Sequence, residues 1–275
     1  MRPTRAQRPD ATDASLASQI VARVIAIANQ KGGVGKTTTA VNLSASLAAA
    51  EQRTLLIDGD PQGNATSGIG LQPDQFRSTV YDVLIGDVSL SDAIVQQVQF
   101  THLDVVAATP DLAGAEIELV DRQDRERRMR NAVESVGQNY DFILIDCPPS
   151  LGLITLNMLA AADALLIPLQ CEYYALEGLS QLLNTVHLVQ RSVNANLAID
   201  GVLLTMYDAR LNLSRQVATE AREYFGNQVF ETVIPRNVRL AEAPSFGKPI
   251  ILYDVASVGA QAYVSVAKEL MRRSK

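Results

Sequence analysis

The 275-residue sequence predicts an α/β protein with a single doubly wound, mostly parallel sheet of about seven or eight strands flanked by helices. Short apolar runs rich in β-branched residues alternate with stretches of helical periodicity, as buried parallel strands and crossover helices do. No shift in composition marks a second domain, and 47% hydrophobic residues suffice for one large core. We therefore expect one globular unit of residues 23–275, preceded by a polar, flexible arm of residues 1–22.

The two kinds of segment follow one another along the chain. We expect strands at 24–29, 54–58, 103–107, 142–146, 164–168, 201–206 and 229–235. Helical periodicity occupies 36–50, 114–138, 151–162, 173–192 and 211–225. Strands joined by such crossovers form one continuous sheet.

Composition and charge argue against several classes of protein. The 30 acidic residues outnumber the 24 basic ones, and the net charge of −6 argues against coating nucleic acid by bulk charge. Two cysteines, Cys147 and Cys171, are too few for a disulfide framework or a four-thiolate metal site, which fits the cytoplasm. The apolar run at 20–28 is interrupted by Arg23, so we expect neither a signal peptide nor a spanning helix.

The most informative stretch is NQKGGVGKTTTAVNL at 29–43, between the first expected strand and the first expected helix. Three glycines let the backbone curl, so that successive N–H groups form an anion-binding nest at the helix N-terminus: Gly32, Gly33 and Gly35. Lys36 is placed to reach β- and γ-phosphates, and the Thr37 hydroxyl is placed to bind Mg²⁺. Gln30 stands where the standard phosphate-loop pattern has its first glycine, and Lys31 follows it.

The segment KGGVGKTT resembles the deviant Walker A loop of the ParA/MinD group of P-loop ATPases, which implies a P-loop NTPase fold with ATP and Mg²⁺ as cofactors. In that group the early lysine, here Lys31, reaches across a dimer interface to the ATP of the partner, much as an arginine finger does. The resemblance implies slow hydrolysis that requires an ATP-bound homodimer, with Lys31 and Lys36 among the catalytic residues. It assigns the whole loop to ATP: Lys31, Gly32, Gly33, Val34, Gly35, Lys36, Thr37 and Thr38.

Two carboxylates follow the expected strand at 54–58. Because side chains alternate along a strand, Asp58 and Asp60 are expected on one side, near the phosphate loop if this strand neighbours the first. The resemblance assigns Asp60 to orienting the attacking water and Asp58 to supporting the Mg²⁺ shell. Alternatively, either aspartate caps a turn.

A third carboxylate, Asp146, ends the apolar run FILID at 142–146. This pattern is typical of a Walker B strand, whose aspartate holds Mg²⁺ through water. The following CPPS is expected to begin a switch segment that senses the γ-phosphate. The alternative is that Asp146 caps the next helix.

Over about residues 24–270 the chain resembles the chromosomal, Soj-like ParA partition ATPases. Matching segments include DPQGNATSG, EIEL, LIDCPPSLG, PLQCEYYALEGLSQL and VIPRNVRLAEAPSFGKPI. The resemblance implies ATP-bound dimers that bind nucleoid DNA without sequence preference in the bacterial cytoplasm. It also implies a ParB-type centromere-binding partner that stimulates hydrolysis and releases the dimers, which drives partition of the chromosome.

The same resemblance assigns two further groups of residues. Arg210 and Arg239 match positions on the DNA-facing side of the dimer, with surface salt bridging as the alternative. Pro235 and Asn237 match the loop that borders the adenine, with Arg236 beside it. A plain turn is the alternative for that loop.

Other functions need features that the sequence lacks or shows weakly. A membrane-cycling ATPase of the MinD kind needs an amphipathic C-terminal helix, but the apolar stripe of 256–275 is modest. We expect the stripe to dock on the core, without stable membrane association: Tyr263, Val266, Ala267, Leu270 and Met271. An iron–sulfur carrier needs cluster-ligating cysteines, and the sequence has no C-x-x-C. Plasmid partition by the same family stays open.

Overall fold

The computed structural model describes residues 22–172 and 175–274, so the expected arm lies outside the described residues except for Ala22. Its sheet has seven strands in the order β3-β4-β2-β5-β1-β6-β7. Only β3 runs antiparallel, at the edge beside β4. The strands are β1 Arg23–Ile27, β2 Thr54–Asp58, β3 Ile94–Val95, β4 Leu103–Val106, β5 Phe142–Asp146, β6 Ala164–Gln170 and β7 Ala198–Thr205. The predicted α/β class and mostly parallel sheet are confirmed.

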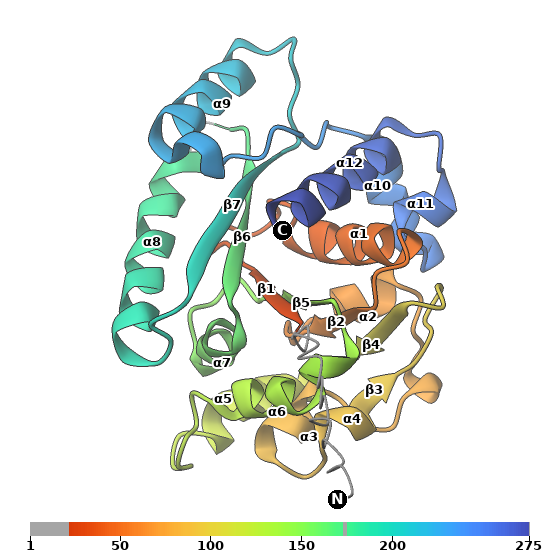
Figure 1. Ribbon diagram of the computed structural model, residues 1–275, viewed down its shortest axis with the longest axis vertical. Coiled ribbons are helices and arrows are strands. Elements are labelled where there is room, and N and C mark those ends of the chain that lie inside the picture. The colour runs from red at the N-terminus through yellow and green to blue at the C-terminus, as the bar shows by residue number, and fades with distance from the viewer. Residues whose placement is uncertain (1–21, 173–174, 275) are drawn as a thin grey trace, which may run out of the picture.

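Helices cover both faces of this sheet, with α1 and α12 together on one face and α6 and α7 on the other (Figure 1). The α-helices are α1 Lys36–Ala49, α2 Asn64–Gly68, α3 Val80–Ile85, α4 Leu90–Ala93, α5 Ala115–Glu118, α6 Arg128–Val136, α7 Leu153–Ala161, α8 Ala175–Ser192, α9 Asn212–Phe225, α10 Val238–Glu242, α11 Ile250–Tyr253 and α12 Val258–Arg273. The 3₁₀ helices are η1 Pro73–Gln75, η2 Pro110–Gly114, η3 Gly137–Asn139, η4 Gly226–Gln228 and η5 Ala243–Phe246.

Two apolar cores lie on opposite faces of the sheet, because successive side chains of a strand point to opposite sides. Val24 and Ala26 of β1 belong to the core that α6 and α7 cover. Ile25 and Ile27 belong to the core that α1 and α12 cover. Burial on both faces explains why the central strands are continuously apolar in sequence.

The C-terminal helix α12 docks on the second core, as predicted. Tyr263, Val266, Ala267 and Leu270 are each at most 2% exposed, and Met271 packs at the edge of the same core. The Tyr263 hydroxyl lies 3.2 Å from the Thr39 hydroxyl of α1. An apolar stripe buried in this way is not presented to a lipid surface. In the described part of the chain, no helix is long and apolar enough to cross a membrane.

The strand predicted at 229–235 is wrong. This segment runs beside β7 and joins it through two isolated parallel bridges, Val202 to Val229 and Tyr207 to Pro235, and through the Ile234 N–H, which donates to the Leu204 carbonyl at 2.8 Å. The N–H groups of Glu231 and Thr232 donate instead to the Glu269 carboxylate of α12, at 2.8 and 3.0 Å. Because a side chain takes these donors, a continuous backbone ladder does not form.

Other predicted bounds also differ: β1 begins one residue earlier and ends two residues earlier, β6 ends two residues later, and β7 begins three residues earlier and ends one residue earlier. The single helix expected at 114–138 is divided into α5 and α6 by a run of turns in which Asp124 has a positive φ of 55°. A non-glycine residue with this backbone conformation interrupts a right-handed helix. The short edge strand β3 was not predicted.

Candidate active site

The predicted site residues gather where the central parallel strands end. Strand β5 lies between β1 and β2, so that Asp146 is in register with both Ile27 of β1 and Asp58 of β2. The second strand is therefore not the neighbour of the first. The sequence analysis placed Asp58 and Asp60 near the phosphate loop on the condition that these two strands were neighbours. Asp60 nevertheless lines the same cavity as the phosphate loop, as expected at the carboxyl edge of an open α/β sheet.

The phosphate loop turns from β1 into α1 through left-handed glycines. Gly33 has φ 74° and Gly35 has φ 90°, a conformation that other residues rarely adopt. Apart from their chain neighbours, no described atom lies within 4 Å of a Cβ placed on Gly32 or Gly33. The Thr205 hydroxyl of β7 donates to the Val34 carbonyl at 2.8 Å and fixes the loop from below. The loop is thus an open cradle on a rigid base.

Lys36 begins α1 and is only 7% exposed. Its Nζ donates a hydrogen bond to the Lys31 carbonyl oxygen at 3.2 Å. Burial lowers the pKa of Lys36, while the carboxylates of Asp146 and Asp60 act in the opposite direction. The residue lines a cavity of about 510 Å³ together with six others predicted to bind the nucleotide or its water: Gly32, Gly33, Gly35, Thr37, Thr38 and Asp60.

Asp146 is a fully buried carboxylate, and among the described residues neither of its oxygens has a hydrogen-bond partner. Burial raises the pKa of Asp146 well above its ordinary value and Asp58 adds to this, whereas the Thr37 hydroxyl and the Lys36 ammonium oppose it. A buried carboxylate is costly unless it meets a cation. Asp146 and the adjacent Thr37 hydroxyl therefore fit Mg²⁺, a cation that prefers oxygen ligands.

This metal site would be completed by phosphates and not by protein alone. Within residues 22–172 and 175–274, no group of three or more His, Cys, Asp or Glu side chains gathers to hold a metal ion. Mg²⁺ typically binds through one or two carboxylates, waters and substrate phosphates. The donor set therefore fits a magnesium ion that arrives with a nucleotide.

Asp58 and Asp60 lie in different environments. The Asp58 carboxylate is fully buried and accepts hydrogen bonds from the Thr66 N–H and hydroxyl, each at 2.7 Å, and from the Asp60 N–H at 3.2 Å. Burial raises the pKa of Asp58 to about 6. Asp60 faces the cavity, and its Oδ1 accepts the Gln62 N–H at 2.9 Å. Asp58 thus ties β2 to α2, while Asp60 borders the place of a ligand.

A second cavity of about 380 Å³ adjoins the first and shares Gly35, Thr38 and Met206 with it. The predicted adenine-bordering residues line this second cavity: Pro235, Arg236 and Asn237. Sequence reasoning missed Met206, which follows β7 with a positive φ of 50° and lines both cavities. A methionine gives no indication in the sequence that its φ will be positive.

Lys31 lies outside the lining of both cavities and faces a carboxylate that the sequence analysis did not single out. Its Nζ lies 3.9 Å from Oε2 of Glu172, and Nη2 of Arg236 lies 3.6 Å from Oε1 of the same carboxylate. Gln170 also donates to Oε1, at 2.5 Å. The one indication of Glu172 in the sequence was that it lies within PLQCEYYALEGLSQL, a segment that matches the family.

Both predicted DNA-facing arginines are exposed and ion-paired. Arg210, with 89% of its side chain exposed, donates to both oxygens of Asp208, at 2.9 and 2.7 Å. Arg239, with 54% exposed, pairs with Glu242 at 2.9 Å and with Asp254 at 3.5 Å. The alternative of surface salt bridging thus describes both side chains in this structure, and contact with phosphate would require them to exchange partners.

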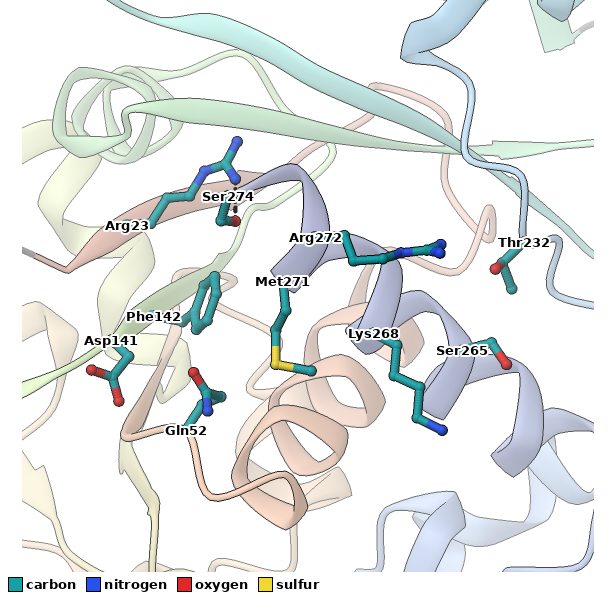
Figure 2. A pocket seen from close by; sticks show the side chains of 10 residues that line it. All are labelled: Arg23, Gln52, Asp141, Phe142, Thr232, Ser265, Lys268, Met271, Arg272 and Ser274. Atoms are coloured by element: carbon teal, nitrogen blue, oxygen red, sulfur yellow. Dashed lines mark hydrogen bonds between the residues drawn. The ribbon is translucent and has the colours of Figure 1, made fainter.

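A wider hollow of about 900 Å³ lies at the opposite end of the sheet, where β1 and β5 begin (Figure 2). Phe142 and Met271 provide its apolar surface, while Lys268 and Arg272 extend from α12. It shares no lining residue with the phosphate-loop cavity. It is therefore a separate surface feature and not part of the candidate active site.

This protein has the features that define the class of P-loop ATPases. They are a parallel sheet, a glycine cradle after its first strand and a buried Walker B carboxylate. Residues 22–199 match the AAA_31 family, described as an AAA domain. The chain is 58% identical over 253 residues to the chromosome partitioning protein ParA of Myxococcus xanthus (strain DK1622), covering 92% of this chain and 89% of that protein. It is 60% identical over 248 residues to the sporulation initiation inhibitor protein Soj of Bacillus subtilis (strain 168), covering 90% and 98%. The chain belongs to the ParA/Soj family of chromosome partitioning ATPases.

Solved structures agree on the fold. A cobyrinic acid a,c-diamide synthase from Mycobacterium smegmatis, with bound ATP analog and magnesium, has 39% identity and a TM-score of 0.80, covering 92% of this chain and 96% of that chain. The Pyrococcus furiosus cell division ATPase MinD has 29% identity and a TM-score of 0.75, covering 91% and 98%.

Proposed function

We propose that this protein hydrolyses ATP with Mg²⁺ in the phosphate-loop cavity and uses the cycle to partition chromosomal DNA. The observation that carries the proposal is the buried Asp146 carboxylate, unpartnered among the described residues, beside Lys36 and Thr37. A carboxylate in this position would be stabilised by a magnesium ion. The bound ATP analog and magnesium of the Mycobacterium smegmatis relative support the same ligand pair.

Each residue of the loop has a defined task in this proposal. The N–H groups of the glycine cradle bind phosphate oxygens, and Lys36 exchanges the Lys31 carbonyl for the β- and γ-phosphates. Thr37 and Asp146 hold Mg²⁺, which when bound neutralises phosphate charge. Asp60 orients the water that attacks the γ-phosphorus, and Asp58 supports this arrangement through the Asp60 N–H. Pro235, Arg236 and Asn237 border the base in the adjoining cavity.

Dimerisation completes the site in this proposal. Lys31 lies outside both cavity linings, with its Nζ facing Glu172. A lysine directed away from its own phosphate cradle is available to a second chain that docks against it. We assign Lys31 to the phosphates of the partner's ATP, where its positive charge offsets charge on the transferred phosphoryl group.

The ATP-bound dimer then binds nucleoid DNA in the cytoplasm through Arg210 and Arg239, without base readout. A ParB-type partner would stimulate hydrolysis and release the dimer. Burial of the apolar stripe of α12 favours DNA over lipid as the surface on which the protein cycles.

Co-sedimentation with DNA and with liposomes tests this function. Samples with ADP, with ATP and with a non-hydrolysable ATP analogue are compared on unrelated duplexes and on anionic vesicles. We expect sedimentation with DNA in the analogue sample, independent of base sequence, and none with vesicles. Sedimentation with vesicles alone would support a membrane-cycling ATPase, and binding to neither in any nucleotide state would contradict the partition mechanism.

A further inference from the structure

Glu116 of α5 caps the N-terminus of α7, a helix that begins 37 residues later in the chain. Its Oε2 accepts the Leu153 N–H at 2.7 Å, and its Oε1 accepts the Ile154 N–H at 3.2 Å. These are N-terminal amides of α7, whose own N-cap residue, Gly152, provides no side-chain cap. A carboxylate at this position satisfies unpaired donors and interacts favourably with the helix dipole.

The backbone is shaped to receive this carboxylate. A Cβ on Gly152 would stand 2.1 Å from Oε1 of Glu116 and 2.6 Å from its Cδ. Because real Cβ atoms do not approach so closely, any side chain at position 152 would displace Glu116. The φ of Gly152 is −81°, which any residue can adopt, so the backbone conformation does not require glycine. A glycine is needed at this position because it leaves room for the Glu116 carboxylate.

The capped N-terminus of α7 directly follows the loop that begins after Asp146, the carboxylate expected to bind Mg²⁺. Residues 147–152 join Asp146 to α7, and Pro149 lines the phosphate-loop cavity. At its start the segment is fixed by the Cys147 N–H, which donates to the Ile27 carbonyl at 3.1 Å. At its end it is held by Glu116 and by the Thr155 hydroxyl, which donates to the Ser150 carbonyl at 2.6 Å. Between these points it contains two prolines, which have no N–H to donate.

We propose that Glu116 is a positioning residue for ATP hydrolysis, which fixes the far end of segment 147–152 so that its middle forms a stable wall of the phosphate cavity. This inference rests on the proposed function. Without the cap, the segment would be fixed firmly only on its Asp146 side, and Pro149 would no longer hold a defined place beside the reacting phosphate. Nucleotide binding should survive, because the cradle and Lys36 are untouched, while the chemical step should slow.

The matched control is Glu118 of the same helix. Its carboxylate accepts a hydrogen bond from the Tyr81 hydroxyl at 2.8 Å and, among the described residues, forms no hydrogen bond or ion pair with α7. In nucleotide-free protein, Glu116→Ala should speed amide hydrogen exchange across residues 147–154, and Glu118→Ala should leave it as in wild type. Unchanged exchange in Glu116→Ala would overturn the proposed cap, whether or not the wild-type protein hydrolyses ATP.

Steady-state kinetics test the catalytic consequence. We expect Glu116→Ala to lower kcat by about tenfold to a hundredfold, the scale of a misplaced active-site wall, with KM for ATP changed less than about threefold. Glu116→Gln, which keeps one acceptor oxygen, should fall between Glu116→Ala and wild type. Faster exchange with kcat unchanged would reduce Glu116 to a structural cap and overturn the positioning role. Failure of the wild-type protein to hydrolyse ATP would contradict the proposed function instead.

A double-mutant cycle uses the close approach itself. Gly152→Ala should lower kcat in the wild-type background, because its methyl group displaces the Glu116 carboxylate. In the Glu116→Ala background the same substitution should change kcat by less than about twofold, since the obstructing oxygen is gone. Equal effects of Gly152→Ala in both backgrounds would show that the two residues act independently and would contradict the proposal.

Discussion

The side chain of Lys36 donates to the backbone carbonyl oxygen of Lys31, with 3.2 Å between Nζ and O. The two lysines of the phosphate loop are thus joined by a hydrogen bond, one through its ammonium and the other through its backbone. A phosphate in the cradle would take the ammonium from the carbonyl, so nucleotide binding and the conformation around Lys31 are expected to be coupled.

Lys36→Ala should abolish nucleotide binding. The cradle would keep its N–H groups but lose the point charge that neutralises the β- and γ-phosphates, and we expect affinity for ATP to fall at least about a hundredfold. Isothermal titration calorimetry measures this directly. Unchanged affinity in the folded variant would refute the phosphate-loop assignment.

Asp60→Ala should retain ATP and accumulate as a dimer. Asp60 lines the cavity without belonging to the cradle, so its loss removes the orientation of water and leaves phosphate binding intact. Size-exclusion chromatography with light scattering, in ATP and Mg²⁺, reports the dimer. Hydrolysis by this variant at the wild-type rate would exclude the role given to Asp60.

Asp146→Asn should stabilise the nucleotide-free protein at pH 8 while abolishing hydrolysis. Because the pKa of Asp146 is raised in the folded state, its stabilising contribution is full at low pH and lost as the pH rises through that pKa. The amide avoids this loss, and we expect a Tm higher by about 2–8 °C at pH 8 and a smaller gain at pH 5. Thermal melts at the two pH values measure the difference. A variant with a lower Tm than wild type at both pH values would show that the buried Asp146 charge does not destabilise the folded protein.

Charge changes around the two surface arginines test the DNA face. Asp208→Asn releases Arg210 from its ion pair and should raise affinity for DNA by up to about fivefold. Arg239→Glu should abolish DNA binding and leave ATP-dependent dimerisation intact. Each lost phosphate contact should reduce the log–log salt slope by about one unit per protomer.

Fluorescence anisotropy on unrelated duplexes measures the affinities of these variants. Glu134→Gln, which changes charge equally but pairs with Arg130 on α6, is the matched control for Asp208→Asn. An Arg239→Glu dimer that binds DNA like wild type would show that this face does not contact DNA.

The sequence predicted the parts of the fold that depend on local pattern. The strands at 54–58 and 142–146 have the predicted bounds, because continuous apolar runs there end at aspartates on the carboxyl edge. The segment at 229–235 has the composition of a strand but loses its ladder to the Glu269 carboxylate, 38 residues away from Glu231. No local pattern reports a partner so distant.

The candidate site shows the same division. Glycines of the phosphate loop are recognisable because left-handed backbone restricts the residue type. Glu116 and Glu172 are not recognisable in this way, since an exposed glutamate in sequence resembles any solvated charge. Their importance comes from α7 and Lys31, which only the folded chain brings beside them.

The central claim, a site completed across two chains, is tested most directly by mixing two variants that each hydrolyse ATP poorly. Lys31→Ala should bind ATP but hydrolyse it poorly, and Asp60→Ala lacks the water-orienting carboxylate. In a mixed dimer, one of the two sites would combine an intact Asp60 with an intact Lys31 from the partner. The account predicts that ATPase activity, low in each variant alone, rises in the mixture in proportion to the mixed dimers formed. Verified mixed dimers without recovered activity would contradict action of Lys31 across the interface.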